Sequence, residues 1–185
     1  MAPTDAIPPD LQKAAESLEA RLTLLRAPTY KIPASEWRGL DLAIQALVPG
    51  WLSALLKNYS FAGLILEFQN HNKEYRWPTT FGFFLPVSFA QYFQSGSLYL
   101  DLIACGFLPF ASEEDGNVWL LTSKDGPHGA VYLLDHSAWG GGMPNRDNGL
   151  IYAHRDLPSF LSCMAVSDET FSLRPGMCMW TPLRS

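Results

Sequence analysis

The sequence predicts a domain in which helices pack on one face of an antiparallel β-sheet. The first observation is the segment from Gly106 to His136, where three short apolar runs are separated by two turn clusters. Each cluster contains an Asp-Gly pair, at Asp115-Gly116 and at Asp125-Gly126, and glycine adopts positive φ at little steric cost. Such runs predict a three-stranded antiparallel meander. The second observation is the helical spacing of apolar residues before the meander, which predicts a lid on the sheet.

Length and composition predict a single folded domain with a small appendage. The chain has 185 residues, which is enough to bury a core without a disulfide or a metal ion. Apolar residues make up 48% and charged residues only 17%, which excludes a disordered chain. The net charge of −5 argues against nucleic-acid binding, because such proteins present a basic face. A mildly acidic surface suits a basic protein partner.

The cysteines and the N-terminus predict a cytoplasmic protein. The three cysteines, Cys105, Cys163 and Cys178, are widely spaced and form no CxxC pair, so we interpret them as buried, reduced thiols. The first residues contain neither the basic nor the apolar region of a signal peptide. The longest apolar stretch, Leu98 to Ala111, contains Asp101 and is too short to cross a bilayer. We therefore expect no membrane association.

Residues 1–34 are predicted to form an N-terminal helical extension and a linker. Pro8-Pro9-Asp10 is a favourable helix start, because proline fits the first turn and acids stabilise this end of the dipole. The apolar positions that follow recur at steps of three and four: Leu11, Ala15, Leu18, Leu22 and Leu25. This stripe packs either on the body of its own domain, which we favour, or on a partner or a second copy.

The next segment, residues 35–68, is predicted to contain two helices and a strand. Ser35 is the expected N-cap of the first helix and Pro49 the first residue of the second. Their apolar positions are Trp37, Leu40, Ile44 and Leu47, and then Trp51, Leu52, Leu55, Leu56 and Tyr59. Gly63–Phe68 has strand character.

Residues 69–105 have the weakest periodicity. Ser88 is the expected cap of a short helix, and Leu98–Ile103 is either a strand or a helical turn. The many aromatic residues between Tyr75 and Phe93 either line a groove or form a second hydrophobic cluster, and we favour the cluster.

Two further elements are expected after the meander. Leu150–Ala153 reads as a strand, and Asp156 as the cap of a helix with Pro158 in its first turn. Residues 167–185 are expected to form an irregular tail.

Several local patterns, taken in order, resemble the SUKH superfamily of Smi/Knr-like proteins. The similar segments are Val48–Tyr59 for its helix pair, Gly106–Phe110 for a strand ending in Pro-Phe, Asp115–Leu121 for a Gly-Asn turn and strand, Val131–His136 for a strand ending in Asp-His, and Leu157–Leu161 for its closing helix. Together they cover roughly residues 35–166, which we define as the SUKH-like domain. Two features depart from the family pattern: Ser60–Gly63 replaces its Asn-Gly step, and the aromatic insert is long.

The resemblance implies an α+β domain with helices packed on one side of a mainly antiparallel sheet. In bacteria, members of this superfamily are commonly immunity proteins in interbacterial competition. They bind and neutralise toxins, often nucleases, that are delivered between cells. The resemblance therefore implies direct binding of a cognate protein toxin and no catalysis. The alternative that it implies is a regulatory or interaction module with a partner other than a toxin.

The sequence contains no recognisable catalytic or metal-binding motif. A metal site would have to combine Asp135-His136 with His154 or His128, and these residues lack the close spacing of known zinc motifs. No local signature supports a Cys–His nucleophile pair. We therefore predict no catalytic residue, no metal and no cofactor, and keep a small hydrolase or metalloenzyme as the least favoured alternative. Asp135-His136 is interpreted as a pairing that anchors the following loop.

Acidic residues of the meander are the predicted partner-binding surface. An acidic patch is steered toward the basic cleft of a nuclease and occupies it in place of nucleic acid. Tryptophan is enriched in interface hot spots, so two tryptophans are candidate anchors. The predicted set is Glu113, Glu114, Asp115, Trp119, Asp125, Asp135, His136 and Trp139. For Trp119 core burial is the favoured alternative, and for the acids an ordinary solvated turn is the alternative.

Overall fold

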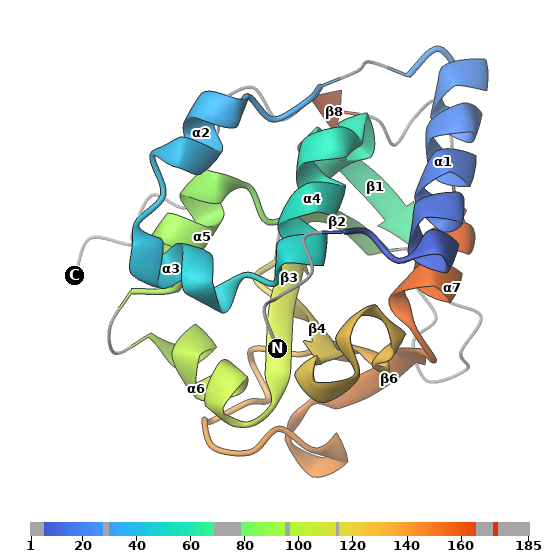
Figure 1. Cartoon of the computed structure of the whole chain (residues 1–185). Helices are drawn as coiled ribbons and strands as arrows, with labels where there is room; N and C mark the ends of the chain where they lie inside the picture. The colour runs from blue at the N-terminus through green and yellow to red at the C-terminus, as the bar shows by residue number, and fades with distance from the viewer. Residues whose placement is uncertain are drawn as a thin grey trace.

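The computed structural model describes residues 6–27, 30–68, 79–94, 97–113, 115–165 and 172–173. These residues form an α+β fold, an antiparallel sheet with helices packed against it (Figure 1). The strands are β1 (Leu64–Phe68), β2 (Thr79–Phe83), β3 (Phe107–Glu113), β4 (Val118–Thr122), β5 (Val131–Leu134), β6 (Leu150–His154), β7 (Met164–Ala165) and β8 (Ser172–Leu173). The helices are α1 (Pro9–Leu24), α2 (Ala34–Arg38), α3 (Leu42–Leu47), α4 (Gly50–Asn58), α5 (Pro86–Tyr92), α6 (Leu98–Ala104) and α7 (Leu157–Ser162), with 3-10 turns η1 (Ser60–Gly63), η2 (Ser123–His128) and η3 (Arg146–Asn148).

The predicted meander is confirmed as strands β3, β4 and β5. The strand order is β6-β5-β4-β3-β2-β1-β7, with β8 paired to β1. The turn between β3 and β4 contains Gly116 at φ 97°, and the connection between β4 and β5 contains Gly126 at φ 58°. Both values lie in the left-handed region that favours glycine. Turn chemistry in the sequence therefore located the centre of the sheet correctly.

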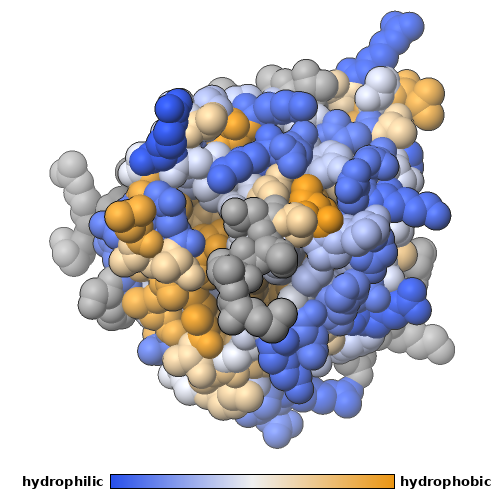
Figure 2. All heavy atoms as spheres, viewed as in Figure 1, coloured by the Kyte–Doolittle hydropathy of each residue, from blue (hydrophilic) through white to orange (hydrophobic). Residues whose placement is uncertain are grey.

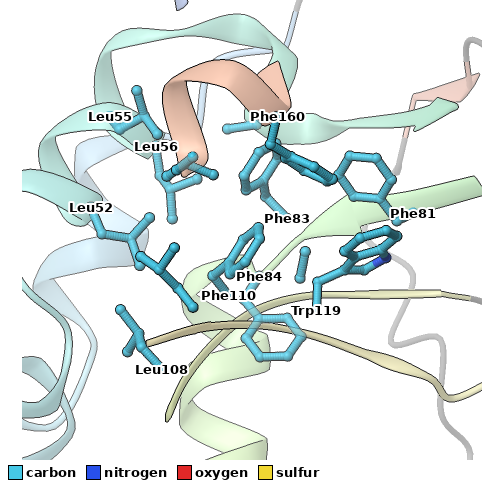
Figure 3. Close-up of a cluster of buried hydrophobic side chains, with 14 of the residues drawn as sticks. Leu52, Leu55, Leu56, Phe81, Phe83, Phe84, Leu108, Phe110, Trp119 and Phe160 are labelled. Atoms are coloured by element: carbon cyan, nitrogen blue, oxygen red, sulfur yellow. The ribbon is translucent and has the colours of Figure 1, made fainter. Parts of the chain in front are cut away.

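The main core lies between the sheet and the helices α4 and α7 (Figure 3). Phe81 and Phe83 project from β2 and Trp119 from β4, and each of them is at most 1% exposed. The ring of Phe160 from α7 lies 5.0 Å from that of Trp119 and 5.5 Å from that of Phe81. Leucines of α4 close the cluster: Leu52, Leu55 and Leu56. Burying each of these side chains contributes about 1.5–3 kcal/mol.

The second face of the central strands is also buried. Every residue of β3 and nearly every residue of β4 is buried, although their side chains alternate between the two faces. On this second face, Tyr132 packs edge-to-face against Phe107 and Tyr152. The Sγ atom of Cys105 lies 3.8 Å from the carbonyl oxygen of Gly142. The β5–β6 loop therefore reaches from one end of the meander to the junction of α6 and β3.

Helix α1 packs on the body of its own chain. Its stripe is buried from Leu11 to Leu22, and α1 lies against α7. The inclusion of Leu25 in the stripe is wrong, because this residue follows the end of the helix and is 37% exposed. The guanidinium of Arg21 donates to the carbonyl oxygens of Leu161 and Met164, at 3.1 and 2.8 Å. These bonds satisfy carbonyls at the C-terminal end of α7. The apolar face of α1 is therefore used inside the chain, as the favoured interpretation expected.

Residues 34–47 form two short helices instead of the single helix that the apolar spacing predicted. The chain leaves the helical path after Arg38, and Asp41 then starts α3 by accepting a hydrogen bond from the backbone of Ala43. Pro33 occupies the N-cap position of α2, so Ser35 lies inside the helix. The N-cap at Asp41 thus divides the segment into two helices, although its apolar pattern is continuous.

The described part of residues 69–105 contains one strand and two helices. Strand β2 pairs with both β1 and β3. Helix α5 begins at Pro86 instead of the predicted cap Ser88. Of the two alternatives for Leu98–Ile103, the helix is the one observed, as α6. The aromatic rings of this region pack on one another, with Tyr92 and Tyr99 stacked at 4.7 Å. The expectation of a separate second cluster is wrong for the described rings, because Phe84, Phe89 and Phe93 belong to the main core and Tyr92 and Tyr99 pack against it. Tyr75, Trp77 and most of the tail lie outside the described residues.

Candidate functional site

Asn117 connects the β3–β4 turn to the loop that follows β5. It is 5% exposed, and its Nδ2 atom donates to carboxylate oxygens of Glu113 and Asp115, at 3.0 and 2.9 Å. Its Oδ1 atom accepts a hydrogen bond of 3.2 Å from the backbone N–H of His136. Buried amides of this kind stabilise a structure when their bonds are made. One buried side chain thus fixes the relative positions of two exposed segments.

The β5–β6 loop is held by its own side chains. The Oδ1 atom of Asp135 accepts bonds of 2.6 and 2.9 Å from the hydroxyl and the backbone N–H of Ser137. The bond from the hydroxyl is the main reason why the pKa of Asp135 lies below its usual value. A capping box of Asn145 and Asn148 orders η3, and Trp139 Nε1 donates to the carbonyl oxygen of Gly142. Asp135 thus bonds within the loop that follows β5, while His136 contacts Asn117.

The exposed and half-buried residues of these two segments are together called the acidic loop end. It consists of Asp115, Asp135 and His136 beside Asn117, and of Trp139, Met143 and Asp147 farther along the loop. Met143 is 59% exposed, Trp139 is half-buried, and the basic Arg146 lies among the acids. This surface combines negative charge with apolar contact area, which suits binding to a basic protein surface.

Asp125 does not belong to the acidic loop end. Val118 pairs with Leu134 at one end of β4, and Leu121 pairs with Val131 at the other. The β4–β5 connection that carries Asp125 therefore lies at the opposite end of the meander from Asp115 and Asp135. The expectation that all of these acids share one edge is wrong, because consecutive turns of a meander lie at alternate ends of its strands.

Two other predicted partner-binding residues lie in the interior. Trp119 is 1% exposed and packs between Phe81 and Phe160, so its position is that of the core alternative. Glu113 is 5% exposed and its carboxylate is bonded to Asn117. Both lie on the face of the sheet that α4 and α7 cover. Glu114 lies outside the described residues.

Helix α3 presents an apolar surface that the sequence did not predict. None of its residues is buried, although its sequence is Leu-Ala-Ile-Gln-Ala-Leu, and Leu42 is 81% exposed. Figure 2 shows apolar residues gathered at the left of the view, over α3 and its neighbouring helices. Val87 of α5 and Leu98 of α6 are 48% and 56% exposed. A hollow beside α3 is lined by residues of α2, α3 and α4, including Trp37 and Lys57.

The three histidines that the structure describes lie in separate places. His136 lies beside Asn117, His128 lies 3.4 Å from Asp10, and His154 Nε2 lies 3.6 Å from Cys163 Sγ. In the described part of the chain, no three side chains of His, Cys, Asp or Glu form a group suited to a metal ion. The sequence did not predict the contact between His154 and Cys163, and the expectation that the cysteines are buried is wrong for the exposed Cys163 and the half-buried Cys105. The signal that could have indicated this contact is a predicted strand followed directly by a short predicted helix, because such a helix can fold back on the strand.

Comparison with known proteins gives no match, since no protein family, curated protein or solved structure is significantly similar to this chain. Among the helices that the structure describes, none has both the length and the apolar character needed to span a bilayer.

Proposed function

We propose that this chain is a cytoplasmic immunity protein of the SUKH superfamily that neutralises a cognate bacterial toxin by direct contact. The α+β architecture, with its antiparallel meander and closing helix, is the one that this resemblance implies. The proposal assigns the chain no catalytic role. Its partner is a protein with a basic functional cleft, such as a nuclease delivered between cells.

The observation that carries the proposal is the pre-organised acidic loop end. Its acids are held in place by Asn117, by the Asp135–Ser137 bonds and by the capping box of η3. A surface that is ordered before binding loses little side-chain freedom on association. Clustered carboxylates accelerate encounter with a basic partner, and an exposed Met143 adds apolar contact once the two proteins meet. The chain then inhibits by occupying the cleft.

Co-expression in a toxin-sensitive bacterium tests this function. The chain is expressed together with the toxin module encoded next to its gene, and growth should be restored. A variant with Asp115→Asn, Asp135→Asn and Asp147→Asn should protect less well, because it lacks three negative charges of the acidic loop end. Asp125→Asn is the matched control at the opposite end of the meander and should protect fully. Absence of growth rescue by the unaltered chain would contradict the proposal.

The apolar surface of α3 favours the second candidate function, an interaction module with a partner other than a toxin. Exposed apolar residues on neighbouring helices are typical of protein-binding surfaces, and electrostatic steering contributes little to such contacts. Under this alternative, Leu42→Ser would weaken partner capture while the triple acid variant would leave it unchanged. Weaker partner capture by the triple acid variant, with capture unchanged in Leu42→Ser, supports the immunity function.

A further inference from the structure

Cys163 and His154 form a surface thiol–imidazole pair. The strand β6 ends at His154, and α7 brings Cys163 back to it at the helix C-cap. The Sγ atom lies 3.6 Å from Nε2 of the ring, and the thiol is exposed. Burial of the ring lowers the pKa of His154 below its usual value, which favours the neutral imidazole, and the geometry of the pair places Nε2 where it can accept the thiol proton. A cysteine thiol and an imidazole within hydrogen-bond reach are the arrangement in which an adjacent base activates the nucleophile.

The pair opens into a hollow that a small molecule can enter. The hollow lies between α1 and α7, and its charged residues are Asp10, Lys13 and Arg155. Asp10 is paired with His128, while Arg155 Nε lies 3.2 Å from a carboxylate oxygen of Asp156 and donates to Ser159 Oγ. The lining thus carries one acidic and two basic side chains. Its lining also includes the hydroxyl-bearing Ser162 next to Cys163.

We propose that Cys163 is a site of reversible S-thiolation by low-molecular-weight disulfides, with His154 as the base that generates the thiolate. The proton of the thiol moves to Nε2, and the thiolate attacks one sulfur of the disulfide. A new S–S bond forms as the old one breaks, and the second half leaves as a thiolate that takes up the proton from His154. Cys163 is oxidised while one half of the disulfide is reduced. This site is independent of the proposed binding function.

Cys105 provides the internal comparison. It is half-buried at the end of α6, and its Sγ atom lies 3.8 Å from the carbonyl oxygen of Gly142, which can only accept a hydrogen bond. A carbonyl oxygen does not serve as the base for a thiol, and Cys105 is less accessible than Cys163. The structure therefore predicts that Cys105 reacts slowly under conditions in which Cys163 reacts quickly.

The test uses two variants of the full chain, each retaining one of these cysteines. Cys105→Ser with Cys178→Ser retains Cys163, and Cys163→Ser with Cys178→Ser retains Cys105. Each is incubated with glutathione disulfide at pH 7, the adduct is followed by intact mass spectrometry, and a reductant should remove it. We expect Cys163 to react at least about tenfold faster than Cys105. Equal rates for the two cysteines would overturn the proposal.

The role of His154 is tested by adding His154→Gln to the variant that retains Cys163. The rate should fall about tenfold near pH 7 and approach that of the unaltered ring above about pH 9, where thiols ionise without a base. A change in exposure alone would shift the rate equally at every pH. A thermal melt shows whether the variant is folded. If it is not folded, the comparison of Cys163 with Cys105 still tests whether Cys163 is the reactive site. An unchanged rate in folded His154→Gln would overturn the assignment of the base.

Discussion

Replacing Trp119 with alanine should lower the free energy of unfolding by about 3–5 kcal/mol, the largest effect expected of any single substitution in this chain. The indole is 1% exposed and lies between the rings of Phe81 and Phe160, with ring centroids 5.5 and 5.0 Å away. Its removal leaves a cavity where strand β4 meets helix α7. Equilibrium unfolding in urea measures the loss.

Leu42→Ala is the matched control for this experiment. Leu42 is 81% exposed, so its truncation should change stability by less than about 0.5 kcal/mol. If Trp119→Ala cost no more than Leu42→Ala, the placement of Trp119 in the core would be wrong. The tryptophan would then become available again as an anchor for a partner.

Glu19→Ala should destabilise the chain by about 2–4 kcal/mol, because its carboxylate caps the start of η1. This carboxylate accepts hydrogen bonds from the backbone N–H groups of Ser60 and Phe61 and from the hydroxyl of Ser60. Ser60 is 3% exposed and Phe61 is inaccessible, so their donors would lose their partner in a buried place. Urea unfolding again measures the change.

Glu16→Ala controls for the general effect of removing an acid from α1. Glu16 is exposed and bonds only to Gln12 on the same helix among the interactions described, so its loss should cost a few tenths of a kcal/mol. Similar costs for the two variants would contradict the view that Glu19 joins α1 to η1. The comparison therefore tests whether the N-terminal helix is held by specific polar contacts.

The sequence predicted the parts of the fold in which local signals and burial agree. Asp-Gly turns between apolar runs predicted the meander, and Asp156 with Pro158 predicted α7, where the side chain of Asp156 accepts a bond of 2.7 Å from the backbone of Ser159. At these positions turn chemistry, capping and hydrophobic pattern indicate the same structure.

The sequence did not predict the elements whose structure depends on packing against residues distant in the chain. The pattern from Trp37 to Leu47 is helical throughout, yet Asp41 starts a new helix in which Leu42 is exposed while Ile44 and Leu47 are half-buried against the core. Strand β2 was not predicted, because its Gly82 and the aromatic residues beside it show no clear alternation. Its assignment depends on pairing with β1 and β3, which are distant in sequence.

The candidate site was only partly predictable for a related reason. Residue type indicated acidic turns, but only strand direction separates Asp125 from Asp115 and Asp135. The sequence did not indicate the connecting role of Asn117, because this role depends on burial of its side chain between two segments. The pair of His154 and Cys163 likewise arises from the return of α7 onto β6.

Titration of the purified toxin module with the purified chain tests the central claim, inhibition by occlusion, most directly. The toxin's activity is measured as the chain is added in increasing ratio, and the mixture is then passed over a gel-filtration column. Occlusion predicts that inhibition is complete at about one equivalent and that the two proteins elute together as a tight complex. Inactivation of many toxin molecules by each chain, or full toxin activity in the presence of excess chain, would contradict it.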